Sequence, residues 1–148
     1  MRNFPPERII CLTEETVETL YLLGEQDRIV GVTGYAVRPP IVRKEKERIA
    51  TFTSAKIGKI ISLKPDLVLA FSDLQAEIAA ELIKNGIAVM TYNQRDIAGI
   101  LAMIRHLGAT VGVGEIAEEI ASSYERRLVD LKNAKKAVAR PQLYFEEW

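Results

Sequence analysis

Few residues of this chain have the types and spacing that covalent chemistry needs. The 148 residues include one histidine, His106, and one cysteine, Cys11, which cannot together form a zinc cluster. No Gly-x-Ser-x-Gly turn is present to anchor a hydrolase triad. The glycines at 108, 112 and 114 follow a helical pattern, so they cannot hold a phosphate in a strand-to-helix turn. We therefore expect no catalytic residue, no metal site and no intrinsic cofactor.

Other polar residues recur directly after short apolar runs. In an open parallel sheet, ligands bind outside the carboxyl ends of the strands, so residues that follow strands are candidates for binding. On spacing alone, helix caps and turns explain the same residues equally well, and Thr13, Ser72 and Asp96 have the sequence of caps. The candidate ligand-binding residues at these positions are Thr13, Glu14, Tyr35, Arg38, Ser54, Ser72, Asp73, Asn93 and Gln94.

The elements that would position these residues alternate along the first two thirds of the chain. Apolar, β-branched runs predict strands, and amphipathic segments between them predict helices that end at glycines 24, 86 and 108. This alternation predicts a parallel, Rossmann-like α/β sheet flanked by helices. The predicted strands span residues 8–12, 28–33, 49–52, 67–71 and 87–92.

The last third has a different pattern. Residues 115–136 contain no helix breaker and carry a narrow apolar stripe, which predicts one helix of roughly 33 Å. Arg140-Pro141 would end it, and residues 142–145 would begin a new strand. We therefore expect an N-terminal α/β ligand-binding lobe at 1–110, a long spanning helix at 111–138, and the start of a truncated second lobe at 139–148.

The charge balance and the N-terminus bear on partners and location. Lys+Arg and Asp+Glu are both 20, which gives no support for a nucleic-acid binder. No apolar run reaches the roughly 20 residues that cross a bilayer. The N-terminus lacks a signal peptide, and Cys11 lacks the leader of a lipid-attachment site. The sequence as written predicts a cytoplasmic protein, or a periplasmic or cell-surface one if its N-terminus is processed or trimmed.

Several motifs resemble one family. Ile57–Leu69 (IGKIISLKPDLVL) is similar to the "ILxLKPDLVL" signature of class III, helical-backbone periplasmic substrate-binding proteins. Residues 28–33 and 85–89 are similar to that family's second strand and to its "x-G-I-x-V" segment. Thr13-Glu14-Glu15, Gly34-Tyr35 and residues 145–148 look most like its cobalamin-type branch. The order of elements agrees from Arg8 to Trp148, so the resemblance spans nearly the whole chain.

The resemblance implies a binding protein with two lobes joined by one stiff helix. Its ligand would be a metal chelate, cobalamin first, or haem or a ferric siderophore, clamped between the lobes and passed to an ABC permease. Ser54, Ser72, Asp73 and Asn93 would donate or accept hydrogen bonds, while Tyr35 and Trp148 would pack on the macrocycle. This sequence departs from the family in lacking a second lobe and an export signal. Gly58 also stands where related proteins often carry a glutamate that pairs with permease arginines.

Two other functions remain open on the same scaffold. The strand expected at 142–145 and a half-covered long helix would expose edge and apolar surface, which favours a homodimerising interaction module. The absence of an export signal favours a cytoplasmic protein that handles a corrinoid or tetrapyrrole. The lack of a nucleophile–base pair disfavours an enzyme of that kind.

Overall fold

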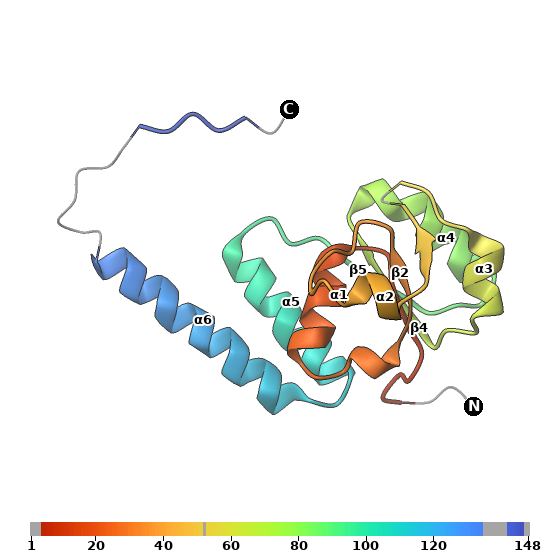
Figure 1. Ribbon diagram of the computed structural model, residues 1–148, viewed down its shortest axis with the longest axis horizontal. Helices are drawn as coiled ribbons and strands as arrows, with labels where there is room; N and C mark the ends of the chain where they lie inside the picture. Colours follow the sequence, from red (N-terminus) through yellow and green to blue (C-terminus); the bar gives the residue numbers. More distant parts are fainter. Residues whose placement is uncertain (1–3, 52, 135–141, 147–148) are drawn as a thin grey trace.

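A five-stranded sheet lies at the centre of the computed structural model, which describes residues 4–51, 53–134 and 142–146. Its order is β3-β2-β1-β4-β5, and every neighbouring pair is parallel, so the predicted parallel α/β sheet is confirmed (Figure 1). Each predicted strand is present within two residues at either end. The strands are β1 (Ile9–Cys11), β2 (Ile29–Thr33), β3 (Arg48–Ala50), β4 (Leu67–Phe71) and β5 (Val89–Tyr92).

Helices cover both faces of the sheet because its central strands are apolar on both sides. Successive strand residues point to opposite faces, so Ile9 and Cys11 pack on one side and Ile10 and Leu12 on the other. The first face is covered by α1 (Glu14–Leu22) and α5 (Ile97–Thr110). The second is covered by α3 (Ile57–Ser62) and α4 (Ala76–Lys84). Three short elements complete the lobe: η1 (Gln26–Arg28), α2 (Val42–Glu45) and η2 (Asp73–Gln75).

Of the three predicted helix caps, one forms as expected. The Asp96 carboxylate accepts a hydrogen bond of 2.7 Å from the Gly99 amide and begins α5. Thr13 precedes α1, but its side chain makes no capping bond. The Thr16 hydroxyl lies 3.4 Å from that of Thr13 and donates to the Thr13 carbonyl, so local side-chain bonding replaces the cap.

The capping box predicted at Ser72–Gln75 is wrong. The Ser72 hydroxyl accepts a 3.3 Å bond from the Leu74 amide, but this begins the short η2, and α4 starts only at Ala76. A capping box would also need the Gln75 side chain to accept from the Ser72 amide. That amide donates instead to the Tyr92 carbonyl at 2.7 Å, because Ser72 still lies beside β5.

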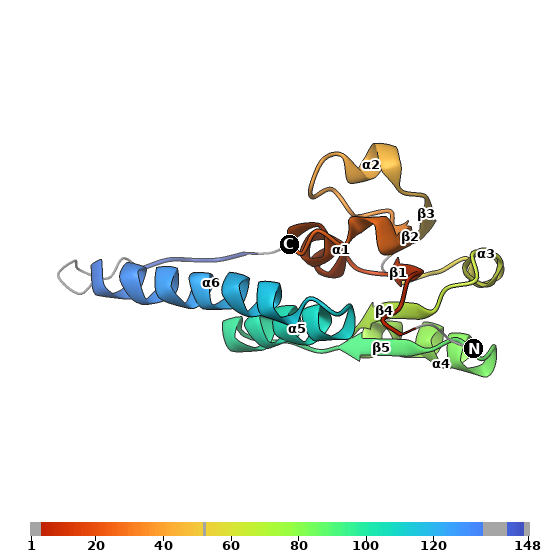
Figure 2. The same cartoon turned by 90° about the horizontal axis from the view of Figure 1, so that it is seen from below.

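The long helix predicted at 115–136 is confirmed over residues 115–134 as α6 (Gly114–Ala134), and residues 135 and 136 lie outside the described residues. Its 21 residues span about 32 Å. Its N-terminal half packs against α5 through the buried Ala117 and Ala121, and Gly112, at φ +85°, turns the chain between the two helices. Figures 1 and 2 show α6 running beside α5 and then projecting past the lobe. None of the described helices combines the length and apolar character needed to cross a bilayer.

The strand predicted at 142–145 is not formed. Residues 142–146 are exposed and outside any strand or helix. A strand is stabilised by hydrogen bonds to a neighbouring strand, and none is described beside this segment (Figure 1). The apolar residues Leu143, Tyr144 and Phe145 therefore do not form a strand where no partner strand is described.

Candidate binding edge of the sheet

Five polar segments lie at the same end of the sheet, beyond the carboxyl ends of its strands, because all five strands are parallel. We call these segments the carboxyl rim. In sheet order they are Ser54 after β3, Tyr35 after β2, Thr13 and Glu14 after β1, Ser72 and Asp73 after β4, and Asn93 and Gln94 after β5. The predicted candidates from distant parts of the sequence are thus brought to the same edge, with Arg38 in the loop that follows Tyr35.

The centre of the rim is a topological switch point. The chain leaves β1 through α1 toward β2, and leaves β4 through α4 toward β5, so the two connections diverge between β1 and β4. Open parallel sheets bind ligands at such points, because diverging connections leave a crevice there. Thr13 and Ser72 lie on its two sides.

A fully buried glutamine ties the two sides together. The Gln75 side chain is 0% exposed. Its Nε2 donates to the Leu12 carbonyl at the end of β1 (3.2 Å), and its Oε1 accepts from the Phe71 amide at the end of β4 (3.0 Å). Gln75 thus replaces the strand-to-strand bonding that stops there. The sequence indicated only a capping role for this residue, so its bridging role was missed.

Ser72 adopts a backbone conformation that is rare for a residue with a side chain. Its φ is +57° and its ψ −177°, a region populated almost only by glycine. The amide bond to Tyr92 and the hydroxyl bond from Leu74 hold it there. Because Ser72 is only 4% exposed, its hydroxyl is used in the bond from Leu74 and is not accessible at the surface. Thr13, at 2%, is equally buried.

The accessible part of the rim carries other side chains. Tyr35 is 61% exposed, and Ser54, Asp73 and Asn93 are also exposed. Leu74 was not predicted as a site residue but lies beside Asp73 with 60% exposure. It was missed because the sequence analysis selected polar residues that follow strands, and leucine is apolar.

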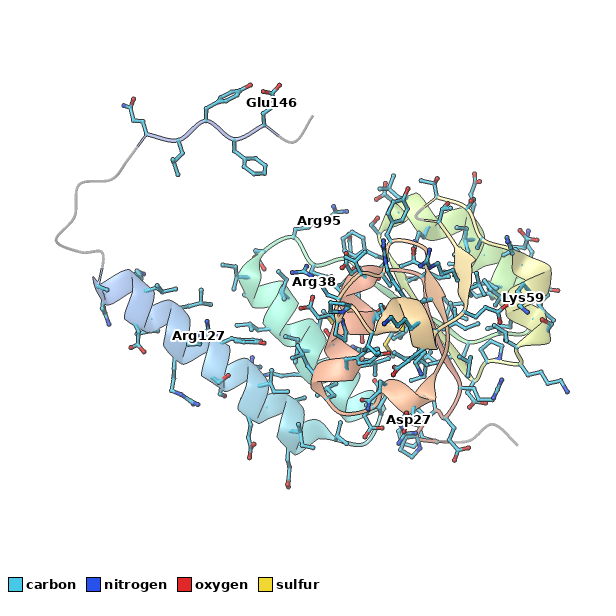
Figure 3. All side chains as sticks on the ribbon, viewed as in Figure 1. Asp27, Arg38, Lys59, Arg95, Arg127 and Glu146 are labelled. Atoms are coloured by element: carbon cyan, nitrogen blue, oxygen red, sulfur yellow. The ribbon has the colours of Figure 1, made fainter. Side chains whose placement is uncertain are left out.

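Two arginines at the rim lie close to carboxylates. Arg38 Nε is 3.6 Å from carboxylate oxygens of both Glu14 and Glu18, and Arg95 Nη2 is 3.6 Å from Asp73 Oδ1. Arg95 also lies over the Phe71 ring, 5.5 Å from its centre. Figure 3 labels both arginines, one from the segment after β2 and one from the segment after β5. Glu18 was missed, although it lies one helical turn from Glu14.

A cavity of about 320 Å³ extends the rim beside β5. It is lined by Tyr92, Asn93, Gln94, Gly99, Ala102, Met103 and His106. The Tyr92 hydroxyl and Gln94 Oε1 are buried and make no hydrogen bond among the described residues. Burial raises the pKa of Tyr92 above its ordinary value, with a smaller contribution from Cys11. The tyrosine therefore stays neutral.

The two residues that could have carried reactive chemistry are placed differently. Cys11 is buried in β1, and burial raises the pKa of its thiol to about 12, so the thiolate does not form near neutral pH. His106 is exposed, with its ring edge-to-face on Tyr92 at 5.9 Å. Within the described ranges, no group of three or more histidine, cysteine or acidic side chains could hold a metal ion. Trp148, the remaining predicted site residue, lies outside the described residues.

Comparison of the sequence with known proteins gives consistent matches. The sequence model of a family described as "Periplasmic binding protein" matches residues 9–148. A vitamin B12-binding protein of Vibrio cholerae is 34% identical over 148 residues, covering 97% of this chain and 52% of that protein. An uncharacterized ABC transporter substrate-binding lipoprotein of Bacillus subtilis is 30% identical over 141 residues, covering 93% of this chain and 44% of that protein.

Solved structures agree on the fold. The crystal structure of the periplasmic vitamin B12 binding protein of Vibrio cholerae has a TM-score of 0.81 and 30% identity, covering 91% of this chain and 53% of that one. A periplasmic haem binding protein from Pseudomonas aeruginosa has a TM-score of 0.79 at 22% identity, covering 92% and 50%, and thus shares the fold. The chain spans about half the length of the curated relatives it matches.

Proposed function

Because this chain belongs to the periplasmic binding protein family, we propose that its carboxyl rim forms one wall of a ligand site in a longer substrate-binding protein. The resemblance seen at Ile57–Leu69 is thereby confirmed. The observation that carries the proposal is the gathering of five strand-end segments around the switch point between β1 and β4. The ligand would be a metal chelate, with cobalamin first and haem or a ferric siderophore as the other candidates.

The binding chemistry would be non-covalent. Exposed Tyr35 and Leu74 offer apolar area to a flat macrocycle, and Asn93 and Asp73 offer hydrogen-bonding groups at its border. The buried Thr13 and Ser72 would shape the floor. Glu14, Arg38, Ser54 and Gln94 complete the proposed set, with Trp148 as its member from the C-terminal segment.

The longer protein would work with an ABC permease. Relatives named as substrate-binding lipoprotein or periplasmic binding protein support capture outside the cytoplasmic membrane. We further propose the division into a lobe at 1–110, a spanning helix at 111–138 and the start of a second lobe at 139–148. The exposed Leu128, Val129 and Leu131 on the projecting half of α6 are consistent with that division, since a second lobe would cover them.

A single lobe supplies only one wall, so this chain alone should bind weakly. Ligand sites typically bury about 70–90% of a drug-sized ligand. The test is calorimetric titration of the chain, and of its longer parent protein, with cyanocobalamin, haemin and a ferric siderophore. We expect saturable binding of one of them by the parent and at least roughly tenfold weaker binding by the chain.

Matched variants decide whether the rim is the binding surface. Tyr35→Ala and Asn93→Ala should each weaken binding several-fold. Their controls are Phe4→Ala, an exposed aromatic residue in the N-terminal segment before β1, and Asn85→Ala, which follows α4 at the amino end of β5. Equal losses in variants and controls would place the ligand elsewhere. An absence of saturable binding to any chelate, in chain and parent alike, would remove the proposal.

The homodimer expected through the unfinished second lobe remains a prediction. Light scattering of the chain over a range of concentrations would decide it, and a monomer at every concentration would end the idea of an interaction module.

A further inference from the structure

A second cavity lies at the far end of the carboxyl rim, beside the edge strand β3. Its volume is about 270 Å³, and it is lined by Arg48, Ile49, Ala50, Thr51, Ser54, Ala55 and Lys56. We call it the β3-edge cavity. Complete ligand sites occupy about 300–1,000 Å³. The β3-edge cavity therefore suits one charged group of a ligand better than a whole chelate.

Two positive charges line this cavity without an ion-pair partner. Neither Arg48 nor Lys56 lies within ion-pair distance of a carboxylate among the described residues. The nearest acidic residue in sequence, Glu47, is 2.9 Å from Lys59, which is labelled in Figure 3. That carboxylate is thus engaged by a different cation. The arginine and lysine of the cavity remain available to an anion.

Hydrogen bonds connect the backbone segments on the two sides of the cavity. The Thr51 amide donates to the Ser54 carbonyl at 2.7 Å, and the two hydroxyls lie 2.7 Å apart. The Ser54 amide donates to the Thr51 hydroxyl oxygen at 3.1 Å, and the Lys56 amide donates to the Ile49 carbonyl at 3.1 Å. Ala50 and Ala55 form an antiparallel bridge between these bonds. These bonds connect the two segments that carry Arg48 and Lys56, which lowers the entropy lost when an anion binds between them.

We propose that the β3-edge cavity binds an oxyanion, either a phosphate ester or a carboxylate, carried as an arm of the bound chelate. Arg48 supplies the planar, forked donor that suits such oxygens, and Lys56 supplies a second charge. Hydroxyl groups of Thr51 and Ser54 add polar contacts at the mouth. That the anion belongs to a chelate rests on the proposed function. The presence of an oxyanion site in this cavity does not.

The first experiment tests the site itself with inorganic phosphate. Amide chemical shifts of the isotope-labelled chain are followed during a phosphate titration. We expect saturable changes centred on residues 48–56, and Arg48→Gln/Lys56→Gln should weaken the response by roughly tenfold. The control Arg43→Gln/Lys84→Gln removes the same charge from exposed residues outside the cavity and should leave the response unchanged. No localised change, or equal loss in both variants, would overturn the proposal.

The second experiment identifies the source of the anion. Cyanocobalamin carries a phosphodiester and haemin carries carboxylates, so phosphate should compete with whichever chelate the parent protein binds. Competition in the parent, and its loss in the Arg48→Gln/Lys56→Gln variant, supports the chelate arm. Phosphate binding without competition would overturn that assignment and indicate a site for free phosphate. Failure of every chelate to bind would remove the proposed function, while the phosphate shifts would still decide the cavity.

Discussion

Gln75 illustrates how one buried polar side chain can set the shape of a binding edge. Its amide satisfies the Leu12 carbonyl and the Phe71 amide, which lie on the two strands that border the switch point. Without Gln75, both backbone groups would be buried and lack a hydrogen-bond partner at the place where the hydrogen bonding between the strands ends. The side chain therefore couples the floor of the carboxyl rim to the stability of the lobe.

We predict that Gln75→Leu destabilises the lobe and weakens ligand binding together. Leucine fills a similar volume but leaves the two backbone groups unpaired, at a cost of about 1–3 kcal/mol for each. Urea unfolding followed by circular dichroism measures the loss. Gln142→Leu, in an exposed segment outside the helices and strands, is the matched control and should change the unfolding free energy little. If the Gln75→Leu chain is as stable as the unsubstituted chain, the bridge contributes nothing to the stability of the lobe.

At the level of single residues, the sequence identified which positions follow strands but not which side chains are accessible. Tyr35 and Asn93 are exposed as a binding role requires, whereas Thr13 and Ser72 are buried. Burial depends on how neighbouring segments fold over a residue, and residue type does not encode it. The positive φ of Ser72 and the bridging role of Gln75 also depend on tertiary contacts, so the local sequence could not predict them.

Between elements, α5 and α6 approach each other closely at Gly108. A β-carbon at this position would overlap the Cβ of Ala117, while Gly108 itself is buried. The small residues at both positions allow the two helices to lie in direct contact. The position of α6 on the lobe therefore depends on an absent side chain.

We predict that Gly108→Ala destabilises the chain by about 1–3 kcal/mol, because the helices must separate or shift to admit the methyl group. Gly58→Ala in α3 is the control, since its β-carbon would meet nothing within 4 Å. That control should be neutral or stabilising by up to about 1 kcal/mol, because alanine favours a helix over glycine. Thermal or urea unfolding of both variants checks the contrast, and equal effects would contradict it.

A polar cluster on the outer side fastens the same two helices. Arg105 of α5 donates two bonds to the Glu118 carboxylate of α6, at 2.7 and 2.9 Å, and one to Glu125 at 3.0 Å. The Ser122 hydroxyl donates to Glu118 at 2.7 Å. Hydrogen bonds from Arg105, and then from Ser122, lower the pKa of Glu118 to about 2 from an ordinary value of 4.5.

This cluster predicts a defined acid sensitivity. A carboxyl group whose pKa is lower in the folded state stabilises the fold at every pH above its unfolded pKa, and the stabilisation is lost as pH falls toward the folded pKa. The contribution of Glu118 should therefore be complete above about pH 5 and decline toward pH 2. As the pH falls across this range, the unfolding free energy should decrease less steeply for Glu118→Gln than for the unsubstituted chain. The exposed neighbour Glu119 is the control, and an identical slope in Glu118→Gln and Glu119→Gln would argue against the cluster.

On the scale of the whole molecule, α6 is half covered and half free. Ala117 and Ala121 are buried against the lobe, but Leu128, Val129 and Leu131 are exposed where the helix projects beyond α5 (Figure 2). Apolar burial sets how strongly a helix resists local opening. The two halves of one continuous helix should therefore differ in stability.

Hydrogen exchange should reveal this difference. We predict that amides of residues 126–134 exchange much faster than those of residues 117–123, and that the loss of protection begins near Tyr124. Exchange monitored by mass spectrometry or NMR checks the profile. Uniform protection along α6 would mean that something covers the projecting half, and light scattering would then show whether it is a second copy of the chain.

The architecture was more predictable than the details. Apolar runs such as Leu67–Phe71 are doubly covered strands, and a sheet of such strands has few arrangements, so the parallel order and the common edge follow from pattern. The α6 helix follows from 21 residues without a breaker. The strand expected at 142–145 did not form because strand structure needs a neighbour. The β3-edge cavity was not predicted, because in sequence Arg48 and Lys56 resemble ordinary solvated charges. Only the pairing of Ala50 with Ala55 brings them to one cavity.

The separation of the two apolar cores from the carboxyl rim has a consequence for how such a chain can change over evolutionary time. Side chains that stabilise the fold pack in the two cores on the faces of the sheet. Residues that could contact a ligand follow the carboxyl ends of the strands. Substitutions along the rim, other than at buried positions such as Gln75, therefore leave the packed interior untouched. One scaffold can in this way acquire new selectivity by small steps, without each step endangering its ability to fold.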